Sequence, residues 1–424
     1  MAEAEPEKAR VPYDVAIAGG GFAGRTLALA LAKLAPQGFR IALIDAEAPR
    51  AGTGGLDDPR ALALSASTKS LLAVLGVWPD IAPNAQAILS IEITDSPLDA
   101  QLRPHFLGFD DELRSGEPGA YLVEHGALSR ALENAVAQER VIEERAIEIF
   151  APETVTGYAT SPFAVTVKLG RGDEIAARLL VAADGKRSRL RERAGIKCVA
   201  WSYPQVGIVT TVAHRRPHGG RAVQHFLPAG PFAMLPLTGN RSSIVWTEGA
   251  LRGAEIMALD EASFTAELAT RFGAKLGAIT LAGPRQSFPL ELQIARSFIA
   301  DRLALIGDAA HVVHPLAGLG LNIGMRDVAA LAEIIVEEAR LGLDIGAAPG
   351  LERYQRWRRF DSAFSAVVMD GLNRLFSNDN APLRTLRDLG LGLVDRTPPL
   401  KRFLVREAAG GTGNVPRLLK GERV

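Results

Sequence analysis

Three glycines near the start of the chain have the spacing of a loop that binds phosphate groups. Gly19, Gly21 and Gly24 form the pattern G-x-G-x-x-G within GGGFAG. The first glycine of such a loop permits a tight turn, the second lets the backbone approach a pyrophosphate, and the third lets a helix pack closely on a strand. Free N–H groups at the start of the next helix, around Phe22 and Ala23, would attract phosphate oxygens. The pattern predicts a dinucleotide-binding site.

The residues around this loop predict the elements that would position it. Tyr13–Ala18 is a short apolar run typical of a buried strand, Ala23–Leu34 is typical of a helix, and Arg40–Asp45 of a second strand. Continuous apolar strands of this kind occur in parallel sheets that are covered on both faces. Asp45 ends the second strand, where its carboxylate can accept hydrogen bonds from ribose hydroxyls. These residues are equally compatible with NAD and with FAD.

Two later motifs distinguish between these dinucleotides. VAADGKRSRLR (181–191) contains Asp184, and a segment that begins LALIGDAAHVVHPLAGLGLN at residue 303 contains Asp308. Both resemble motifs of the FAD-dependent aromatic hydroxylases, whose fold is like that of para-hydroxybenzoate hydroxylase. The resemblance implies that Asp308 contacts the ribityl chain of FAD and that the segment after it surrounds the isoalloxazine ring. The further FAD-binding residues that it implies are Asp184, Gly307, Gly318, Gly320, Leu321 and Asn322.

The turn before residue 322 has features that suit a flat ring. Its glycines bring backbone N–H groups close to a ligand, and it leads directly into a predicted helix over Asn322–Arg340. A helix N-terminus aimed at the flavin would stabilise the negative charge that the reduced ring carries. An NAD-dependent dehydrogenase has no need of a second nucleotide loop so far along the chain. The three motifs in this order therefore favour FAD.

Four more segments resemble the branch of this family that acts in ubiquinone biosynthesis. They are DPRALALSAST (58–68), YLVEHGALSRAL (121–132), QHFLPAGPFAMLPL (224–237) and DGLNRLFSND (370–379). Enzymes of this branch hydroxylate the ring of polyprenylated phenols at a membrane surface. The resemblance implies a lipophilic prenylated phenol as substrate, O2 as co-substrate, and contacts with other ubiquinone-biosynthesis proteins or with the membrane.

Two positions depart from the family pattern. Leu319 stands where the family usually has glutamine, and His125-Gly126 stands where it often has an Asn-Arg pair. The second difference removes an arginine that could contact the flavin. Arg60 is the remaining candidate for that contact, and the alternative is that Arg60 is an exposed cation of a loop.

The resemblance also implies a reaction. NAD(P)H would bind transiently and reduce FAD, O2 would add at C4a of the flavin, and the resulting hydroperoxide would transfer a hydroxyl group to an electron-rich ring. Water must be excluded, because a wet hydroperoxide collapses to hydrogen peroxide. A strand-rich region over residues 201–247 is predicted to wall the substrate pocket. Its candidate lining residues, each of which could instead belong to the core, are Phe226, Phe232, Leu235 and Trp246.

The sequence does not identify a catalytic acid or base. His314, in the loop that should touch the flavin, and His225, in the predicted substrate region, are the candidates, and a structural role is the alternative for both. The same alternatives hold for His214 and His218. The pair His311 and His314 lacks a third ligand, so no metal site is predicted.

Composition limits the remaining classes of partner. The 48 basic residues balance the 48 acidic ones, so no net field favours nucleic acid or an acidic membrane. Cys198 is the single cysteine, which excludes an intramolecular disulfide and suits a reducing compartment. The first ten residues lack the apolar core of a signal peptide, and no apolar stretch of about 18 residues is present. We expect a cytoplasmic protein, with peripheral association with the inner membrane as the alternative.

These observations predict an α/β fold with three parts. A Rossmann-type FAD-binding domain would comprise residues 1–80, 120–198 and 285–345. A mostly antiparallel β-sheet substrate domain would be inserted as residues 81–119 and 199–284. A C-terminal helical region would comprise residues 346–424, with apolar positions that suit either a membrane or partner surface or packing on the FAD-binding domain.

The leading hypothesis is an FAD-dependent monooxygenase that hydroxylates the ring of a polyprenylated phenol. Two alternatives stay open. One keeps the fold and changes the reaction to that of a flavin reductase or of a hydroxylase of small soluble phenols. The other is a catalytically silent flavin-binding subunit that acts as a scaffold for other biosynthetic enzymes.

Overall fold

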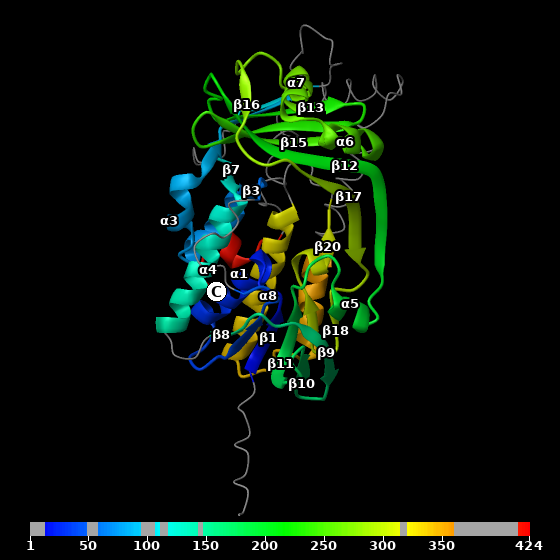
Figure 1. Ribbon diagram of the computed structural model, residues 1–424. Helices are drawn as coiled ribbons and strands as arrows, with labels where there is room; N and C mark the ends of the chain where they lie inside the picture. The colour runs from blue at the N-terminus through cyan, green and yellow to red at the C-terminus, as the bar shows by residue number, and fades with distance from the viewer. Residues whose placement is uncertain are drawn as a thin grey trace, which may run out of the picture.

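The structure, a computed structural model, contains two large β-sheets with helices packed on them and a small third sheet between them (Figure 1). No helix among the residues described below is long and apolar enough to cross a lipid bilayer. The structure describes residues 13–48, 58–94, 107–110, 118–142, 147–313, 320–359 and 414–424.

The first sheet has eight strands and a parallel centre. Strand β1 pairs in parallel with β2 and β11, and the parallel pairing continues to β8 beyond β2 and to β19 beyond β11. Every residue of β2 and all but one of β1 are buried, as the apolar runs predicted. The strands are β18 (Ile299–Ala300), β19 (Leu303–Leu305), β11 (Glu174–Ala182), β1 (Tyr13–Ala18), β2 (Ile41–Ile44) and β8 (Ile147–Phe150) in spatial order, with β10 (Val165–Leu169) and β9 (Val155–Thr160) continuing from β11.

Helices packed on this sheet complete the largest hydrophobic core. Helix α1 contacts α4 and α8, and its Leu27 and Leu31 are fully buried in the core with Ile17 of β1. The apolar positions of α8 at Leu331 and Ile335 recur at helical spacing and point into the same core. These elements are α1 (Phe22–Leu34), α4 (His125–Ile142), α5 (Arg189–Arg193), the short 3-10 helix η2 (Gly307–Ala309) and α8 (Gly320–Arg340).

The second sheet has nine strands, and all but one of its pairings are antiparallel. Its exception is β13, which pairs in parallel with β5. Helices α6 (Ala250–Ala258) and α7 (Glu261–Phe272) lie on the side of this sheet that faces away from α8 (Figure 1). The strands are β20 (His311–Val312), β17 (Gln286–Ala295), β12 (Cys198–His214), β15 (Arg241–Gly249), β14 (Gly230–Leu237), β13 (Arg221–Leu227), β5 (Ser90–Thr94) and β6 (Leu107–Asp110) in spatial order, with β16 (Ile279–Leu281) beside β12.

A three-stranded sheet joins the two larger ones. Its Ala63, Ile88 and Leu122 share a hydrophobic cluster with Ala222 of β13 and Leu237 of β14. Short helices connect β3 to β4 along the chain. The elements are β3 (Ala61–Ser65), β7 (Ala120–Glu124) and β4 (Gln86–Ile88), with α2 (Ala66–Val74), α3 (Trp78–Ile81) and the 3-10 helix η1 (Ala82–Asn84).

The described residues after α8 pack on the first sheet and its helices. Residues 348–359 are helical, and Tyr354 donates a hydrogen bond to Leu305 O of β19 at 2.7 Å. The 3-10 helix η4 (Arg417–Lys420) is held by Arg417 N, which donates to Glu333 Oε2 of α8 at 2.7 Å. The apolar positions 372–403 that could form a membrane or partner surface lie outside the described residues.

The predicted fold class is confirmed, and several elements differ from the prediction. Strand β17 was assigned to the FAD-binding domain, but it pairs with β12 in the nine-stranded sheet. Phe232 and Trp246 were candidate pocket residues, but both are at most 1% exposed and pack with Phe264 in the cluster under α6 and α7. The sequence interpretation did not find α6, α7 or the three-stranded sheet. The remaining domain bounds stay a prediction.

Candidate functional site

The glycine loop joins β1 to α1, and its glycines have different surroundings. Gly19 has a φ of +114°, and a Cβ atom there would overlap the carbonyl oxygen of Ala183. A Cβ atom at Gly24 would overlap the carbonyl oxygen of Gly19. At Gly21, by contrast, a Cβ atom would meet nothing within 4 Å. Close packing therefore requires Gly19 and Gly24, whereas Gly21 faces open space, as a loop that approaches a pyrophosphate requires.

The start of α1 offers free backbone donors. Gly21 is the N-cap residue, so no side chain caps the helix, and its first turn contains no acidic residue. Phe22 and Ala23, the next two residues, are only half-buried. The N–H groups and positive dipole end of α1 are thus available to an anionic ligand.

Asp45 follows β2 and is fixed beside the loop. Its Oδ2 accepts a hydrogen bond from Arg25 Nη2 at 3.2 Å, and Arg25 also pairs with Glu133 of α4 at 2.9 Å. A Cβ atom at Gly20 would overlap the Asp45 carboxylate, so this middle glycine is needed as well. Neither Gly20 nor Arg25 was predicted from the sequence as a site residue. The signal for Arg25 was a basic residue one turn into the helix, near the acidic residue that ends the next strand.

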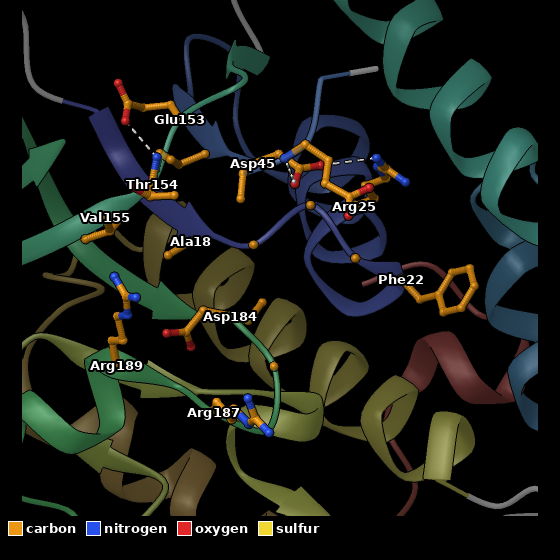
Figure 2. A pocket seen from close by; sticks show the side chains of 18 of the residues that line it. Ala18, Phe22, Arg25, Asp45, Glu153, Thr154, Val155, Asp184, Arg187 and Arg189 are labelled. Atoms are coloured by element: carbon orange, nitrogen blue, oxygen red, sulfur yellow. Dashed lines mark hydrogen bonds and ion pairs between the residues drawn. The ribbon is translucent and has the colours of Figure 1, made fainter. Parts of the chain in front are cut away.

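These residues line a pocket of about 600 Å³ at the carboxyl ends of β1, β2 and β11. Figure 2 shows Asp45 and Arg25 on one side of it and Asp184, Arg187 and Arg189 on the other. In open α/β sheets this edge is where ligands bind. The other lining residues are Ala18, Gly19, Gly20, Gly21, Phe22, Ile44, Ala46, Glu47, His125, Ser129, Glu153, Thr154, Val155, Ala183 and Gly185.

Asp184 brings an unpaired oxygen atom to this wall. Its Oδ2 accepts a hydrogen bond from Leu190 N at 3.3 Å, whereas its Oδ1 is buried and has no partner among the described residues. A buried carboxylate oxygen without a donor is costly unless a ligand hydroxyl completes it. Arg187 and Arg189 add exposed cations on the same segment. One pocket is thus lined by a carboxylate that can accept from hydroxyl groups, by cations and by free backbone N–H groups. This combination fits a dinucleotide such as FAD.

The second motif is held by a buried ionic network. Gly307 N donates to Asp327 Oδ2 at 3.0 Å, and the same oxygen lies 2.6 Å from His311 Nε2. Arg358 Nε donates to Asp327 Oδ1 at 2.8 Å. Burial alone would raise the pKa of the Asp327 carboxyl, but His311 and Arg358 hold it below its usual value. The sequence interpretation missed Asp327 and Arg358, and the structure gives His311 this structural role.

Asp308 lies in η2, directly after Gly307 of this network. It is an exposed residue, yet desolvation of its carboxyl raises the pKa, against the opposing effects of His311, Arg60 and Lys186. The raised pKa means that the charged carboxylate is incompletely solvated. Its predicted contact with the ribityl chain of FAD stays a prediction.

The residues at the start of α8 fix that helix to the three-stranded sheet. Asn322 Nδ2 donates to Ala63 O at 2.7 Å, and its Oδ1 accepts from Ser65 N at 2.9 Å and from Thr68 Oγ1 at 2.8 Å. The Asn322 side chain is thus used inside the protein, and its predicted FAD contact could come from the backbone alone. Gly320 and Leu321 begin the helix, and Leu321 packs on the main core. Gly318 and His314 lie outside the described residues.

Arg60, directly before β3, contacts both α4 and β17. Its guanidinium pairs with Asp58, with Nη2 2.5 Å from Oδ2, and Nη2 is 3.3 Å from His125 Nε2. Its guanidinium carbon is 5.3 Å from the ring centroid of Phe288 on β17. Burial lowers the pKa of His125, with Arg60 acting in the same direction and Asp58 opposing it. A neutral His125 accepts from Arg60, because a guanidinium can only donate.

The candidate histidines of the nine-stranded sheet have protein partners. His225 contacts Thr94 Oγ1 through Nδ1 and stacks on Phe232, which places it under α6 and α7. His214 Nδ1 is 2.7 Å from Arg216 O, and His218 Nε2 is 2.8 Å from Leu237 O. These placements do not support a catalytic role. The described part of the chain contains no group of three or more His, Cys, Asp or Glu residues that could hold a metal ion.

Comparison with known proteins gives consistent matches over almost the whole chain. Residues 12–359 match a family model described as an FAD binding domain. The ubiquinone hydroxylase UbiL of Rhodospirillum rubrum is 43% identical over 411 residues, which cover 96% of this chain and 92% of that protein. The 3-demethoxyubiquinol 3-hydroxylase of Escherichia coli is 34% identical over 403 residues, which cover 94% of this chain and 99% of that protein.

The fold is also similar to that of solved structures. The p-nitrophenol 4-monooxygenase PnpA of Pseudomonas putida has a TM-score of 0.76 at 19% sequence identity, and the match covers 95% of this chain and 99% of that one. PqsL of Pseudomonas aeruginosa has a TM-score of 0.74 at 20% identity, with 91% of this chain and 100% of that one covered. At these identities the matches establish the fold.

Proposed function

The chain belongs to the FAD-binding-domain family that its motifs predicted, and from this we propose that it is an FAD-dependent monooxygenase that hydroxylates the ring of a polyprenylated phenol in ubiquinone biosynthesis. Two relatives matched over at least 94% of the chain are named as hydroxylases of ubiquinone or of a demethoxyubiquinol. Their similarity extends through both large sheets, so it is not confined to the cofactor pocket.

The geometry of one pocket supports a dinucleotide cofactor, and the family match supports FAD as that dinucleotide. A single pocket combines the open backbone at Gly21, the fixed carboxylate of Asp45 and the unpaired Asp184 oxygen. We infer that Asp45 and Asp184 accept hydrogen bonds from the hydroxyl groups of FAD. Arg187 and Arg189 would attract its pyrophosphate, together with the N-terminus of α1.

FAD supplies the redox chemistry that activates O2 when it is bound. The protein supplies position, solvent exclusion and charge. Overall, NAD(P)H donates two electrons, one oxygen atom of O2 enters the ring, and the other leaves as water. The sequence contains one loop of the G-x-G-x-x-G type, which supports our proposal that NAD(P)H binds transiently without such a loop of its own.

Oxygen-dependent turnover tests this proposal directly. Purified holoprotein with NADH or NADPH and a short-chain prenylphenol should give a ring-hydroxylated product that carries heavy-isotope oxygen from labelled O2. Reductant oxidation should rise when the prenylphenol is added. A bound flavin with no oxygenated product from any prenylphenol would favour the silent scaffold, and turnover of unprenylated phenols alone would favour the hydroxylase of soluble substrates.

The lipophilic substrate leads to a proposal about location. We propose that the protein associates peripherally with the inner membrane and with other ubiquinone-biosynthesis proteins, because a polyprenyl substrate resides in lipid. Flotation of the holoprotein with vesicles that contain a polyprenylphenol should exceed flotation with vesicles that lack it. Equal and negligible flotation in both would contradict membrane association and leave the reaction itself unaffected.

A further inference from the structure

The two faces of the nine-stranded sheet are buried to different extents. On β5, Glu92 and Thr94 are buried, while Ile91 and Ile93 between them are only half-buried. Side chains alternate between faces along a strand, so the two pairs point to opposite sides. On β13 the buried Val223 packs in the cluster with α6 and α7. The face that carries Ile91 and Ile93 is therefore the one opposite α6 and α7, and we call it the open face.

The strand register shows which residues share the open face. Gln224 of β13 lies beside Ile93 of β5 and opposite Ala233 of β14. Ala233 is opposite Val245 of β15, which is opposite Val209 of β12. These five residues form one row across five strands, and all but Val209 are half-buried. We call this set the central row.

The direction of the open face follows from the neighbours of Gln224. Ala222, two residues earlier and so on the same face, clusters with Leu122 of β7 in the three-stranded sheet. In Figure 1 that sheet and the first turns of α8 lie on the side of the nine-stranded sheet opposite α7. The central row therefore faces the part of the protein that holds the cofactor pocket and the start of α8.

Gln224 is the single polar side chain of the central row. No hydrogen bond of its amide to another described residue is present, whereas Gln205 of β12 donates to Ala229 O at 2.6 Å. An amide has two N–H donors and a carbonyl acceptor. Once a ligand covers it and excludes water, an unpaired amide is destabilising, unless the ligand itself provides the partner. An isolated amide among apolar side chains is how ligand sites fix orientation.

We propose that Gln224 binds an oxygen substituent on the aromatic ring of the substrate and selects for rings that carry one. This inference rests on the proposed function, and it adds a residue that determines specificity. A ring hydroxyl can donate to the Gln224 carbonyl or accept from its NH2 group, and a methoxyl oxygen can accept. Ile93, Ala233 and Val245 provide the apolar surface on which the ring lies.

Binding measurements on the holoprotein test the inference without turnover. The probes are 2-(3-methylbut-2-enyl)phenol and its counterpart without the hydroxyl, (3-methylbut-2-enyl)benzene, and the readout is the change in flavin absorbance on titration. The wild type should prefer the phenol by roughly 10- to 100-fold, the value of a hydrogen bond to a group otherwise left unpaired. Gln224→Leu should abolish this preference, because the phenol loses its partner and the deoxy probe no longer covers an unpaired amide, so the two changes are not additive.

A matched control and a second variant show whether the effect is specific to the Gln224 amide. Gln86→Leu changes a half-buried glutamine of β4 whose amide bonds only the neighbouring Ala87 O among described residues, and it should keep the wild-type preference. Gln224→Met, close to glutamine in shape, replaces Gln224→Leu if the latter loses flavin. An unchanged preference in a flavin-replete Gln224 variant would overturn the inference. A wild type that binds neither probe would instead contradict the proposed substrate class.

Discussion

The cofactor pocket and the open face of the nine-stranded sheet are built from different parts of the chain. At the pocket, Gly19 and Gly24 let backbone pack on backbone, and the buried Asp327 network fixes the second motif. At the open face, half-buried side chains such as Gln224 and Val245 stand on a regular ladder. Backbone sites tolerate little change, whereas side chains on a sheet can be exchanged without altering the fold. The comparison implies that cofactor binding is the rigid property of this protein and substrate choice the adjustable one.

The largest effect is expected at Asp327. Asp327→Asn would remove the carboxylate that balances Arg358 and His311, all three at most 2% exposed. Breaking a buried pair leaves an uncompensated charge, so we expect the free energy of unfolding to fall by about 3–5 kcal/mol, with loss of flavin. Urea unfolding of the apoprotein and the flavin content of purified protein measure this. The double variant Asp327→Asn, Arg358→Met should recover part of the loss, and no recovery would contradict the charge-balance explanation.

The same carboxylate predicts a dependence on pH. The pKa of Asp327 is lowered in the folded state, so its stabilising contribution is complete above the ordinary carboxyl pKa and is lost as the pH falls through the lowered value. The wild type should therefore lose stability relative to Asp327→Asn in acid. Thermal unfolding of both proteins from neutral to strongly acid pH measures the difference. A constant gap between the two melting temperatures over this range would contradict the assignment.

Two glycines of one loop should give opposite results. Gly24→Ala would place a methyl group on the carbonyl of Gly19, a backbone atom that cannot move aside, and we expect a loss of about 3 kcal/mol in stability. Gly21→Ala meets nothing within 4 Å, so its stability should stay within about 0.5 kcal/mol of wild type. Its methyl group would instead occupy space next to the helix N-terminus and weaken FAD binding. Equal melting temperatures for the two apo variants would contradict the division between packing and ligand space.

Asp308→Asn should separate stability from cofactor binding. A folded-state pKa that is raised means that the contribution of Asp308 to stability is complete below the ordinary carboxyl pKa and is lost as the pH rises through the raised value. The neutral asparagine avoids this loss, so the apo variant should melt at a higher temperature than wild type at neutral pH. Its affinity for FAD, measured by quenching of flavin fluorescence, should fall roughly 10- to 100-fold because a charge-assisted hydrogen bond is lost. A lower melting temperature together with unchanged affinity would reverse the assignment.

The cofactor pocket was largely predictable from the sequence because its requirements are local. A tight turn needs glycine, and a carboxylate about 20 residues later marks the end of the next strand, so Gly19, Gly21 and Asp45 could be placed without a structure. Arg25 and Asp327 were not found, because each acts on a residue that is distant in sequence or on another element. Nothing near residue 327 in the sequence indicates that Gly307 and Arg358 lie beside it.

The substrate region was less predictable because it depends on strand register. Phe232 and Trp246 were candidates for the lining of the substrate pocket, but side chains at these positions point under α6 and α7. A shift of one residue exchanges the two faces of a strand, so Ala233 and Gln224 could not be assigned to the open face before the pairing of β13 with β14 was known. The two helices that cover the other face were themselves not predicted, so the sequence did not indicate which face of the sheet is covered.

Ala233→Leu should give the smallest change in stability and a clear change in substrate binding. Ala233 is half-buried in the central row, so a larger side chain extends into open space, and the free energy of unfolding should change by no more than about 0.5 kcal/mol. Its neighbour Phe232 points to the opposite face and is fully buried, so Phe232→Leu should lose about 1–2 kcal/mol while substrate affinity is retained. Affinity of the holoprotein for a short-chain prenylphenol should fall roughly 10-fold in Ala233→Leu only, with FAD affinity unchanged in both variants. If Ala233→Leu instead destabilises the protein as much as Phe232→Leu does, the face is packed rather than open, and the distinction between a rigid cofactor pocket and an adjustable substrate surface does not hold.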